Sequence, residues 1–435
     1  MRFLGIGEYC DLGDMYHRLA AAGHEVRVFV ESSAARDVFG GMLRFTPDWR
    51  ADLHWIREAG EEGTLLFESA VKGELQDKLR RDGYQVIGGS AFGDRLECDR
   101  QFGQDVLRGL GLCTARSHRY TDFGDAIEFV RASRMRYVFK SNGGDTLRTR
   151  NYVGELEDGA DMIALLSLYR SQWREPDKPD FVLMEYVAGV EVGVGAYFNG
   201  TSFLMPACLD WEHKRLFPGD LGELTGEMGT IVTYRGAERI FDATLARMVD
   251  RLRESGYCGY INLNLIANEQ GLWPLEFTSR FGYPGYAICE ALHNEPWDAI
   301  FRKMLRGESL ELQTAAGFAA GVVLTVPPFP YSHGYAELSK GAPISFRASL
   351  TQADRDCLHL AEVALRDAQL VTSGATGYVG VATGTGNSVE QARDSAYELA
   401  RKVVVPNLRY RVDIGERVAR HDLSRLQALG YLAIA

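Results

Sequence analysis

Short apolar runs alternate with segments of helical spacing over about the first 95 residues. Strands are predicted at 2–6 and 25–30, and the apolar positions of 14–22 recur between them at the spacing of a helix. Further strands are predicted at 64–67 and 84–89, each beside a helix. Because strands that alternate with helices pack as a parallel sheet, we expect an open parallel α/β domain at the N-terminus.

In the middle of the chain, strands follow one another through tight turns. Asn199-Gly200 and residues 268–271 are predicted as hairpin turns, which implies antiparallel pairing of the strands on either side. The elements expected in this part are helices at 97–111, 160–174 and 239–255 and strands at 136–140, 181–186, 191–198, 259–266 and 272–277.

A third pattern begins at about residue 315. An apolar strand is predicted at 317–326, a glycine-punctuated strand at 370–381, and a strongly amphipathic helix at 388–404. We expect this part to be a separate, smaller α+β unit. The four domains predicted from these changes of pattern are 1–96, 97–180, 181–314 and 315–435.

The length and charge of the chain narrow the classes of function. A chain of 435 residues is too long for one ordinary hydrophobic core, so two to four domains are expected. The net charge of −11 argues against a general nucleic-acid or anionic membrane surface. A local basic pocket for phosphates remains compatible with that charge. No apolar segment reaches the roughly 18 residues that a membrane span needs.

Cysteine usage and the start of the chain suggest a compartment. The seven cysteines are scattered and form no Cys-x-x-Cys pair, which argues against a zinc site or a disulfide framework and favours a reducing cytosol. The first apolar run is short and an acid follows it soon, so we interpret it as a strand and not as a signal peptide. We expect a cytoplasmic protein with no membrane and no nucleic-acid partner.

The segment 218–229, Pro-Gly-Asp-Leu-Gly-Glu-Leu-Thr-Gly-Glu-Met-Gly, is the most unusual stretch of the sequence. Glycine is used where the backbone needs a positive φ or must approach a ligand closely. A loop so rich in glycine, acid and hydroxyl is costly to order unless it closes over something. The basic triplet 213–215 precedes it, and Glu276-Phe277-Thr278-Ser279-Arg280-Phe281-Gly282 follows about fifty residues later.

These three patches, in this order, resemble those of the glycinamide ribonucleotide synthetase (phosphoribosylamine–glycine ligase) family of the ATP-grasp superfamily. The loop of that family reads approximately D-G-D-x-G-P-N-T-G-G-M-G, and its metal-binding strand reads E-F-N-x-R-F-G-D-P-E. The resemblance runs from Glu97 into the C-terminal unit. It implies an N-terminal pre-ATP-grasp domain, a two-lobed ATP-grasp core and a small C-terminal α+β domain.

Several residues are candidates for binding ATP. Lys140 ends an apolar strand and precedes Ser141-Asn142-Gly143-Gly144-Asp145, an arrangement that suits phosphate, and Arg100 has a similar status near the start of a helix. The family resemblance implies that Glu185, Tyr186 and Val187 face the adenine. It also implies that the carboxylate of Glu191 accepts the ribose hydroxyls.

A metal site is predicted at the end of the strand that contains Glu276. A carboxylate in this place suits Mg²⁺, with Mn²⁺ as an alternative, because these ions complete their shells with phosphates and water. The resemblance places a second ligand two residues on, where Thr278 replaces the family's Asn. Asn262 and Asn264 lie on the neighbouring strand, on one face, and are either compensating ligands or ordinary polar residues.

Basic residues near the glycine loop are interpreted as an anion clamp. By resemblance to the family, the expected catalytic residues are Arg280, Lys214 and Asp220. The expected substrate-binding residues are His213, Arg215, Thr225, Gly226, Met228 and Gly229.

The departures from the family pattern gather on the substrate side. The first turn, residues 5–11, lacks the Arg and His of G-N-G-G-R-E-H, and the turn at 141–148 lacks the second lysine of A-D-G-L-A-A-G-K-G. Glu227 replaces a glycine of the loop, and Tyr283-Pro284-Gly285 replaces D-P-E, so that both acids are lost. The ligase chemistry is therefore a firmer expectation than the purine substrate.

The sequence thus predicts an ATP-dependent, ADP-forming carboxylate–amine ligase that works through an acyl-phosphate. The expected partners are glycine or another amino acid as carboxylate and phosphoribosylamine or an analogue as amine, with a monomeric or homodimeric enzyme. Three alternatives stay open: an amide or peptide ligase of a specialised pathway, an ATP-dependent carboxylase or biotin-dependent relative, and a nucleotide-binding protein that has lost catalysis.

Overall fold

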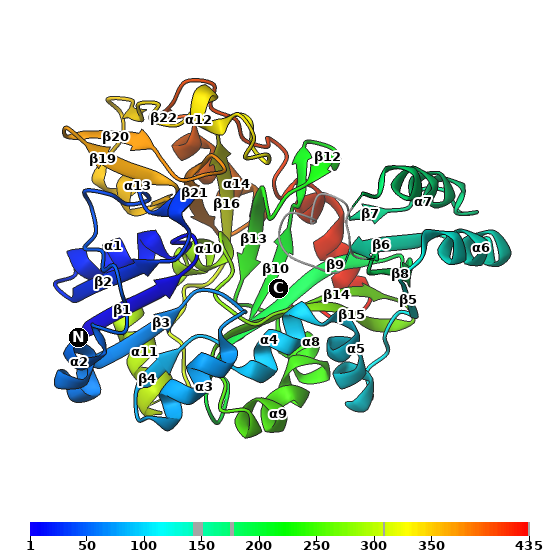
Figure 1. The fold of residues 1–435 in the computed structure, drawn as a ribbon, viewed down its shortest axis with the longest axis horizontal. Coiled ribbons are helices and arrows are strands. Elements are labelled where there is room, and N and C mark those ends of the chain that lie inside the picture. Colours follow the sequence, from blue (N-terminus) through cyan, green and yellow to red (C-terminus); the bar gives the residue numbers. More distant parts are fainter. Residues whose placement is uncertain (142–150, 175–177, 308, 434–435) are drawn as a thin grey trace.

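A computed structural model describes residues 1–141, 151–174, 178–307 and 309–433. At the N-terminus four parallel strands form a sheet in the order β2-β1-β3-β4 (Figure 1), as the alternating pattern predicts. Its strands are β1 (Arg2–Gly7), β2 (Glu25–Val30), β3 (Gly63–Phe67) and β4 (Gln85–Ile87), and the helical segments beside them are α1 (Gly13–Ala21), η1 (Ser33–Ala35), α2 (Leu53–Glu58), η2 (Gly60–Glu62) and α3 (Gly73–Arg81).

A small lobe projects from the body of the molecule (Figure 1). Its antiparallel sheet has the order β5-β8-β6-β7 and packs against two helices through a core rich in aromatic rings. Phe181, for example, stacks on Phe123 with ring centroids 5.0 Å apart. The elements are β5 (Ser117–Tyr120), α6 (Phe123–Ser133), β6 (Tyr137–Ser141), β7 (Tyr152–Val153), α7 (Ala160–Gln172) and β8 (Phe181–Glu185).

An eight-stranded sheet in the order β15-β14-β9-β10-β13-β16-β21-β18 is the centre of the molecule. A hydrophobic cluster lies on each face, so the sheet is buried on both sides. Its strands are β9 (Val190–Asn199), β10 (Cys208–Glu212), β13 (Gly229–Thr233), β14 (Cys258–Asn268), β15 (Gly271–Thr278), β16 (Phe318–Thr325), β18 (Leu358–Leu360) and β21 (Tyr378–Gly386).

Helices and short hairpins complete this body. The hairpin β11 (Arg215–Phe217)–β12 (Leu221–Leu224) rises from the central sheet (Figure 1). The other elements are α4 (Ala91–Cys98), α5 (Arg100–Gly109), α8 (Glu238–Ala243), η4 (Leu245–Met248), α9 (Val249–Glu254), α10 (Gly285–Glu290), α11 (Trp297–Arg306), α12 (Tyr335–Leu338), β17 (Ser345–Phe346), α13 (Gln352–Asp356), β19 (Val363–Arg366), β20 (Gln369–Thr372), α14 (Val389–Ala400), β22 (Val403–Val404), the π-helix η5 (Val418–Asp422) and α15 (Leu423–Ala428).

The C-terminal part shares the central sheet. Strand β16 pairs with β13 on one side and with β21 on the other. The four predicted domain boundaries stay a prediction, but the strands after residue 315 continue the sheet that begins with β15. None of the helices in the described ranges is long and apolar enough to cross a membrane.

Four predicted elements are wrong in detail. The helix expected at 388–404 ends at Ala400, and Val403–Val404 forms the strand β22. The helix expected at 97–111 is two helices, because Asp99 takes an extended backbone and its carboxylate accepts the amide of Phe102 at 3.0 Å as the cap of α5. The helix expected at 239–255 breaks into α8, η4 and α9 around Thr244. The strand expected at 370–381 is two strands, β20 and β21, separated by residues 373–377.

Candidate active site

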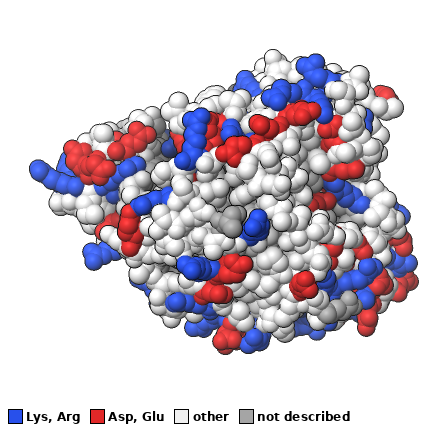
Figure 2. Space-filling model, turned by 180° about the vertical axis from the view of Figure 1, so that it is seen from behind, with Lys and Arg blue, Asp and Glu red and all other residues white. Residues whose placement is uncertain are grey.

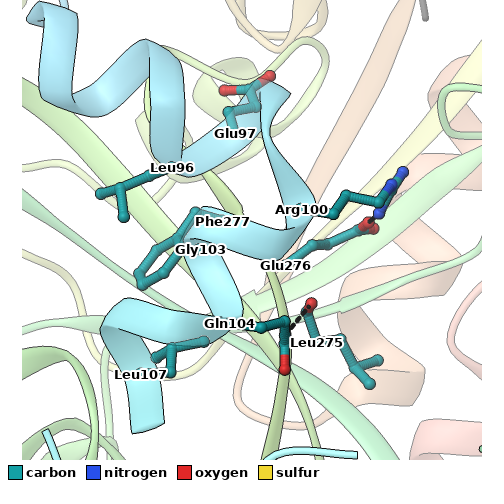
Figure 3. Close-up of a pocket in the computed structure, with 9 residues that line it drawn as sticks. All are labelled: Leu96, Glu97, Arg100, Gly103, Gln104, Leu107, Leu275, Glu276 and Phe277. Atoms are coloured by element: carbon teal, nitrogen blue, oxygen red, sulfur yellow. Dashed lines mark hydrogen bonds and ion pairs between the residues drawn. The ribbon is translucent and has the colours of Figure 1, made fainter. Parts of the chain in front are cut away.

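Three cationic side chains converge on the carboxylate of Glu276, which lies near the end of β15. Arg100 donates from the start of α5 at 2.6 Å, and Lys140 donates from β6 at 3.0 Å, both to the same oxygen Oε2. Lys214, two residues after β10, lies 3.5 Å from the other oxygen, Oε1. Figure 3 shows the Arg100–Glu276 pair. Lys140 belongs to the small lobe, so its ion pair with Glu276 joins that lobe to the central sheet.

Lys214 also connects this cluster to two further acids. Its ammonium lies 2.8 Å from Oε2 of Glu212 and 3.7 Å from Oε1 of Glu191. Glu191, at the start of β9, is the most exposed acid of the group, with 44% of its side chain accessible. The site therefore places three cations and three carboxylates in one network at the junction of the small lobe and the central sheet.

The charges of the network shift the pKa of each member in a direction that follows from its neighbours. Lys140, with Arg100 and Lys214, holds the pKa of Glu276 well below its ordinary value, and these attractions outweigh burial. Burial lowers the pKa of Lys140, although Glu276 opposes this effect. Burial alone would lower the pKa of Lys214, but the carboxylates around it raise that pKa well above its ordinary value.

The lowered pKa of Glu276 predicts an acid-sensitive contribution to stability. The ionised carboxylate is favoured in the folded state, so this stabilisation is present above the ordinary pKa of 4.5 and is lost as the pH falls towards the folded-state pKa. We expect the free energy of unfolding of the Glu276→Gln variant to fall less steeply below pH ~4.5 than that of the wild type. Urea unfolding at several pH values measures both slopes, and parallel slopes would contradict the prediction.

The start of α5 is held against β15 by packing and by one buried amide. Gln104 donates from Nε2 to the carbonyl of Leu275 at 2.8 Å, and Figure 3 shows it beneath Arg100. Gly103 allows close packing, because a Cβ at this position would lie 2.9 Å from the carbonyl of Leu96. The helix cap at Asp99 and this anchor together direct Arg100 towards Glu276.

The oxygen and amide groups beside Glu276 fit a hard metal ion. In the β14–β15 register, Asn264 is opposite Glu276 and Asn262 is opposite Thr278. No group of three or more His, Cys, Asp or Glu side chains that could enclose a metal is found in the described residues. A Mg²⁺ ion bound with ATP needs only one or two protein carboxylates, since phosphates and water supply its other ligands. Glu276 with Thr278 as second donor is compatible with that requirement.

The residues predicted to face adenine lie at the end of β8 and at the start of the linker to β9. The amide of Glu185 donates to the carbonyl of Arg116 at 2.9 Å, and the amide of Tyr186 donates to that of Arg136 at 3.1 Å. The guanidinium of Arg136 lies 3.5 Å from the centre of the Tyr186 ring. The amides of Glu185 and Tyr186 are therefore used within the protein, which leaves the amide of Val187 and the linker carbonyls as the groups to consider for a nucleotide base.

The glycine-rich segment 218–229 was expected to be a loop, but its first half forms the turn and the second strand of the hairpin β11–β12. Thr225 donates from its amide and from its hydroxyl to the carbonyl of Lys214, each at 2.8 Å, so it positions Lys214. Gly226 places an imagined Cβ 3.1 Å from the hydroxyl of Tyr378, whereas Met228 is buried and Gly229 begins β13 with a φ of 152°.

Asp220 at the tip of this hairpin pairs with the C-terminal part of the chain. Its carboxylate lies 2.8 Å from Arg411 and 3.1 Å from Arg417, and the amide of Gly219 donates to Asp413 at 2.9 Å. These contacts border a cavity of about 290 Å³. Within the described residues, Asp220 forms ion pairs that hold the hairpin tip and none with the Glu276 network.

We expect the Asp220→Asn variant to loosen the hairpin without unfolding the protein. The pair with Arg417 is exposed and contributes at most about 1 kcal/mol, and the buried Arg411 keeps its ion pair with Asp413, so the fold stays intact but the tip opens more often. Limited proteolysis followed by mass spectrometry should show a several-fold faster cut within 215–226. An unchanged cutting rate there would contradict this prediction.

The remaining predicted residues lie at the margins of the network. The ring of His213 is buried, and its Nε2 accepts the amide of Gly415 at 3.1 Å. Burial, with Arg417 and Arg411 nearby, lowers the pKa of His213 to about 4, so the ring is neutral at pH 7 and supplies no charge to an anion clamp. Arg215 donates to the carbonyl of Gly222 at 2.7 Å.

Arg280 is bound by an acid of the N-terminal side of the site. Its Nε donates to Oε1 of Glu97 at 3.0 Å, and the amide of Ser279 donates to Oε2 of the same carboxylate at 2.8 Å. Glu97 belongs to α4, so this pairing joins the end of β15 to the helix before α5. The predicted phosphate turn after Lys140 falls on residues 142–148, which lie outside the described residues.

Sequence reasoning missed the acids on β10. Asp210 and Glu212 alternate with Trp211 and are followed by Lys214, so they share one face of the strand. Glu212 bonds Lys214 and accepts from Asn264 at 3.0 Å, which makes it a full member of the network. The period-two spacing of charges in Asp-Trp-Glu-His-Lys, residues 210–214, was the available signal.

Comparison with known proteins assigns the chain to a family. The model of the phosphoribosylglycinamide synthetase ATP-grasp (A) domain matches residues 98–286, and the model of the C domain of the same enzyme matches 319–417. The two matches together cover about two thirds of the chain. The chain belongs to the phosphoribosylglycinamide synthetase family.

Curated members of the family are similar over most of their length. The phosphoribosylamine–glycine ligase of Pseudomonas aeruginosa is 28% identical over 371 residues, which are 82% of this chain and 82% of that protein. The ligase of the same name from Thermotoga maritima is 29% identical over 334 residues, covering 74% of this chain and 77% of the relative.

Solved structures show that the family fold extends over nearly the whole chain. The crystal structure of phosphoribosylamine–glycine ligase from Thermotoga maritima has a TM-score of 0.71 at 24% identity and covers 95% of this chain and 100% of that one. A biotin carboxylase from Campylobacter jejuni has a TM-score of 0.63 at 10% identity, covering 94% and 92%. The network around Glu276 thus lies in an ATP-grasp fold, and the expectation of a two-lobed core is confirmed.

Proposed function

We propose that this protein is an ATP-dependent, ADP-forming ligase that joins a carboxylate to an amine. The observation that carries the proposal is the convergence of Arg100, Lys140 and Lys214 on Glu276, from separate segments of an ATP-grasp fold. Three cations around one carboxylate suit a site that receives the triphosphate of ATP. Glycine and phosphoribosylamine are the first substrates to test, because curated relatives are named phosphoribosylamine–glycine ligases.

The residues of the network act by placement and charge neutralisation. Arg100 and Lys140 bind phosphate oxygens when the nucleotide enters, while Lys214 supplies a further positive charge where the carboxylate of the substrate meets the γ-phosphate. Attack of that carboxylate gives an acyl-phosphate and ADP. The amine then attacks the acyl carbon, the C–N bond forms, and phosphate leaves. The hairpin 215–224 shields the intermediate from water.

Mg²⁺ fits the donor set better than a softer metal, because the available ligands are carboxylate, hydroxyl and amide oxygens. Glu276, with Thr278 as second donor, would hold it. When bound, the ion neutralises charge on the transferred phosphoryl group.

The test is the release of ADP by the purified protein with MgATP, glycine and freshly generated phosphoribosylamine, with the amide product identified by mass spectrometry. Release that requires both substrates supports the proposal with the purine substrates. ATP binding without release in a broad panel of carboxylates and amines would instead indicate a nucleotide-binding protein that has lost catalysis. A requirement for bicarbonate would indicate a carboxylase.

A second candidate function keeps the ligase chemistry and changes the amine. The carboxyl ends of β1 and β3 carry acids: Glu8 and Asp11 follow β1, and Glu68 follows β3. The buried Glu68 accepts the amide of Asp11 at 2.9 Å, and burial raises its pKa to about 8. No lysine or arginine occurs in residues 5–11. An acidic strand end disfavours a phosphate dianion, so an amine without phosphate is the specific alternative.

The two candidates differ in a direct comparison of amines. With glycine and MgATP held constant, phosphoribosylamine and a set of uncharged or cationic primary amines are compared by kcat/KM for ADP release. A preference for phosphoribosylamine of tenfold or more supports the purine pathway. A preference for a non-phosphorylated amine supports a specialised ligase.

A further inference from the structure

Two buried carboxylates near the Glu276 network form no ion pair with another described residue. Asp210 on β10 and Glu227, just before β13, are each 6% exposed. In the described ranges no lysine, arginine or histidine nitrogen lies within 4.0 Å of either carboxylate. The nearby ammonium of Lys214 is already shared by Glu212, Glu276 and Glu191. Asp210 and Glu227 are therefore two buried acids beside a network in which Lys214 already pairs with other carboxylates.

The backbone of β9 provides the space for Asp210. Gly193 and Gly195 alternate on the face where β9 lies between β10 and β14, and Gly193 is opposite both Asp210 and Asn264. A Cβ at Gly193 would lie 2.2 Å from Oδ1 of Asp210, so any larger residue would displace the carboxylate. The two glycines let polar side chains from β10 and β14 meet above β9.

One oxygen of Asp210 is buried and unpartnered. Asn262 donates from Nδ2 to the other oxygen, Oδ2, at 2.5 Å, whereas Oδ1 has no hydrogen-bond donor. Glu227 approaches the same region from the hairpin side, where Thr230 donates to it; Thr230 is opposite Glu212 in the β10–β13 register. A buried acceptor without a donor destabilises the folded protein. A bound donor would recover this free energy.

The charges around the two carboxylates indicate that the missing donor is a cation. Burial, with Glu212 and Cys208 nearby, raises the pKa of Asp210 well above its ordinary value, and burial, with Glu212 and Asp210, does the same for Glu227. Lys214 opposes both shifts but does not outweigh burial, so neither carboxylate has a close positive charge that would keep it ionised. The Glu276 network lies nearby. Asp210 shares one face of β10 with Glu212, and Thr230, which donates to Glu227, is opposite Glu212. Lys214 in turn contacts both Glu212 and Glu276.

We infer that Asp210 and Glu227 form a subsite for a primary ammonium group of a substrate, next to the carboxylate-activation site at Lys214 and Glu276. An ammonium has three N–H donors and one positive charge, so it meets both the unpartnered oxygen of Asp210 and the uncompensated acid pair. The inference rests on the proposed ligase function. The ammonium belongs either to an amino-acid carboxylate substrate or to the amine substrate, which would give one proton to a carboxylate of this pair before the free amine attacks the acyl carbon.

The first experiment measures binding and needs no turnover. Melting temperatures of the wild type, the Asp210→Asn/Glu227→Gln double variant and an Asp242→Asn surface control are recorded with MgATP and rising concentrations of glycine, glycinamide or glycolate. We expect glycine and glycinamide, which carry an ammonium, to raise the melting temperature of the wild type and of the control. Glycolate carries no ammonium and should leave both melting temperatures unchanged. The double variant should lose the response to glycine and to glycinamide.

Three results would overturn the inference. They are no response of the wild type to either ammonium compound, a response to glycolate equal to that to glycine, and a full response of the double variant. Folding of the double variant is tested independently. Because the raised pKa values mean that the two carboxylates destabilise the folded state when ionised, the free energy of unfolding of the variant at pH 7 should equal or exceed that of the wild type. A normal thermal response in a protein that fails the ligase assay would reject the glycine–phosphoribosylamine pair and support the subsite.

The second experiment identifies the source of the ammonium. Hydroxylamine traps the acyl-phosphate as a hydroxamate, so this partial reaction needs the carboxylate substrate and not the natural amine. A rise of about tenfold or more in KM for glycine in the hydroxamate assay of each single variant assigns the subsite to the amino acid. An unchanged KM for glycine with a similar rise in KM for phosphoribosylamine assigns it to the amine. No rise in either KM would overturn the inference.

Discussion

The Glu276→Gln variant is expected to remain folded and to lose most of its ADP-forming activity, with kcat reduced by about 10²- to 10³-fold. The amide keeps the size of the side chain but removes the negative charge on which Arg100, Lys140 and Lys214 converge. It also removes the carboxylate that suits a divalent ion beside the triphosphate. The placement of the reacting groups and the neutralisation of their charge therefore fail together.

Activity at saturating MgATP, together with circular dichroism, tests this prediction. Glu128→Gln is the matched control, because Glu128 is exposed on α6 of the small lobe and the same chemical change there should leave kcat within about twofold of the wild type. A Glu276→Gln enzyme with kcat within tenfold of the wild type would show that the network is not the site of phosphoryl transfer.

The Lys140→Met variant is expected to raise KM for ATP by about 10- to 100-fold, with a smaller effect on the carboxylate substrate. Methionine keeps the apolar stem of the side chain within β6 and removes the ammonium that the small lobe contributes to the network. Because a hydrogen bond to a charged group is worth more than a neutral one, the loss should appear mainly in nucleotide affinity.

Nucleotide titration followed by calorimetry separates this effect from damage to the fold. Lys178→Met, at an exposed position before β8, is the control and should bind ATP like the wild type. An equal loss of ATP affinity in both variants, or no loss in Lys140→Met, would mean that Lys140 acts outside the nucleotide site.

The strand and helix patterns predicted the N-terminal sheet and the hairpins of the core. The family models confirm the resemblance that the motifs at 213–229 and 276–282 indicated. Local periodicity failed where one residue changes the path of the chain. Asp99 divides the helix expected at 97–111, because a capping side chain with an extended backbone outweighs the apolar stripe on either side. Without that break α5 would not begin at Arg100, and the direction of this arginine was therefore not visible in the sequence.

The candidate site was predicted as a set of separate motifs, and the sequence did not contain their distances. Lys140, Lys214 and Glu276 are distant in the chain, and only the meeting of β6, β10 and β15 brings their charges together. Asp210 was missed for a related reason. Its environment depends on Gly193 in the neighbouring strand, and such cross-strand pairs are set by register and not by local composition.

The ion pair between Lys140 and Glu276 has a consequence for how ATP affinity depends on salt. Without nucleotide, the ammonium of the small lobe already faces a negative group of the central sheet. When a phosphate takes the place of that carboxylate, one ion pair is exchanged for another and the number of pairs in the site hardly changes. Added salt weakens the ion pair that is lost as well as the one that is gained. Although ATP is highly charged, its affinity for this protein should therefore vary little with ionic strength.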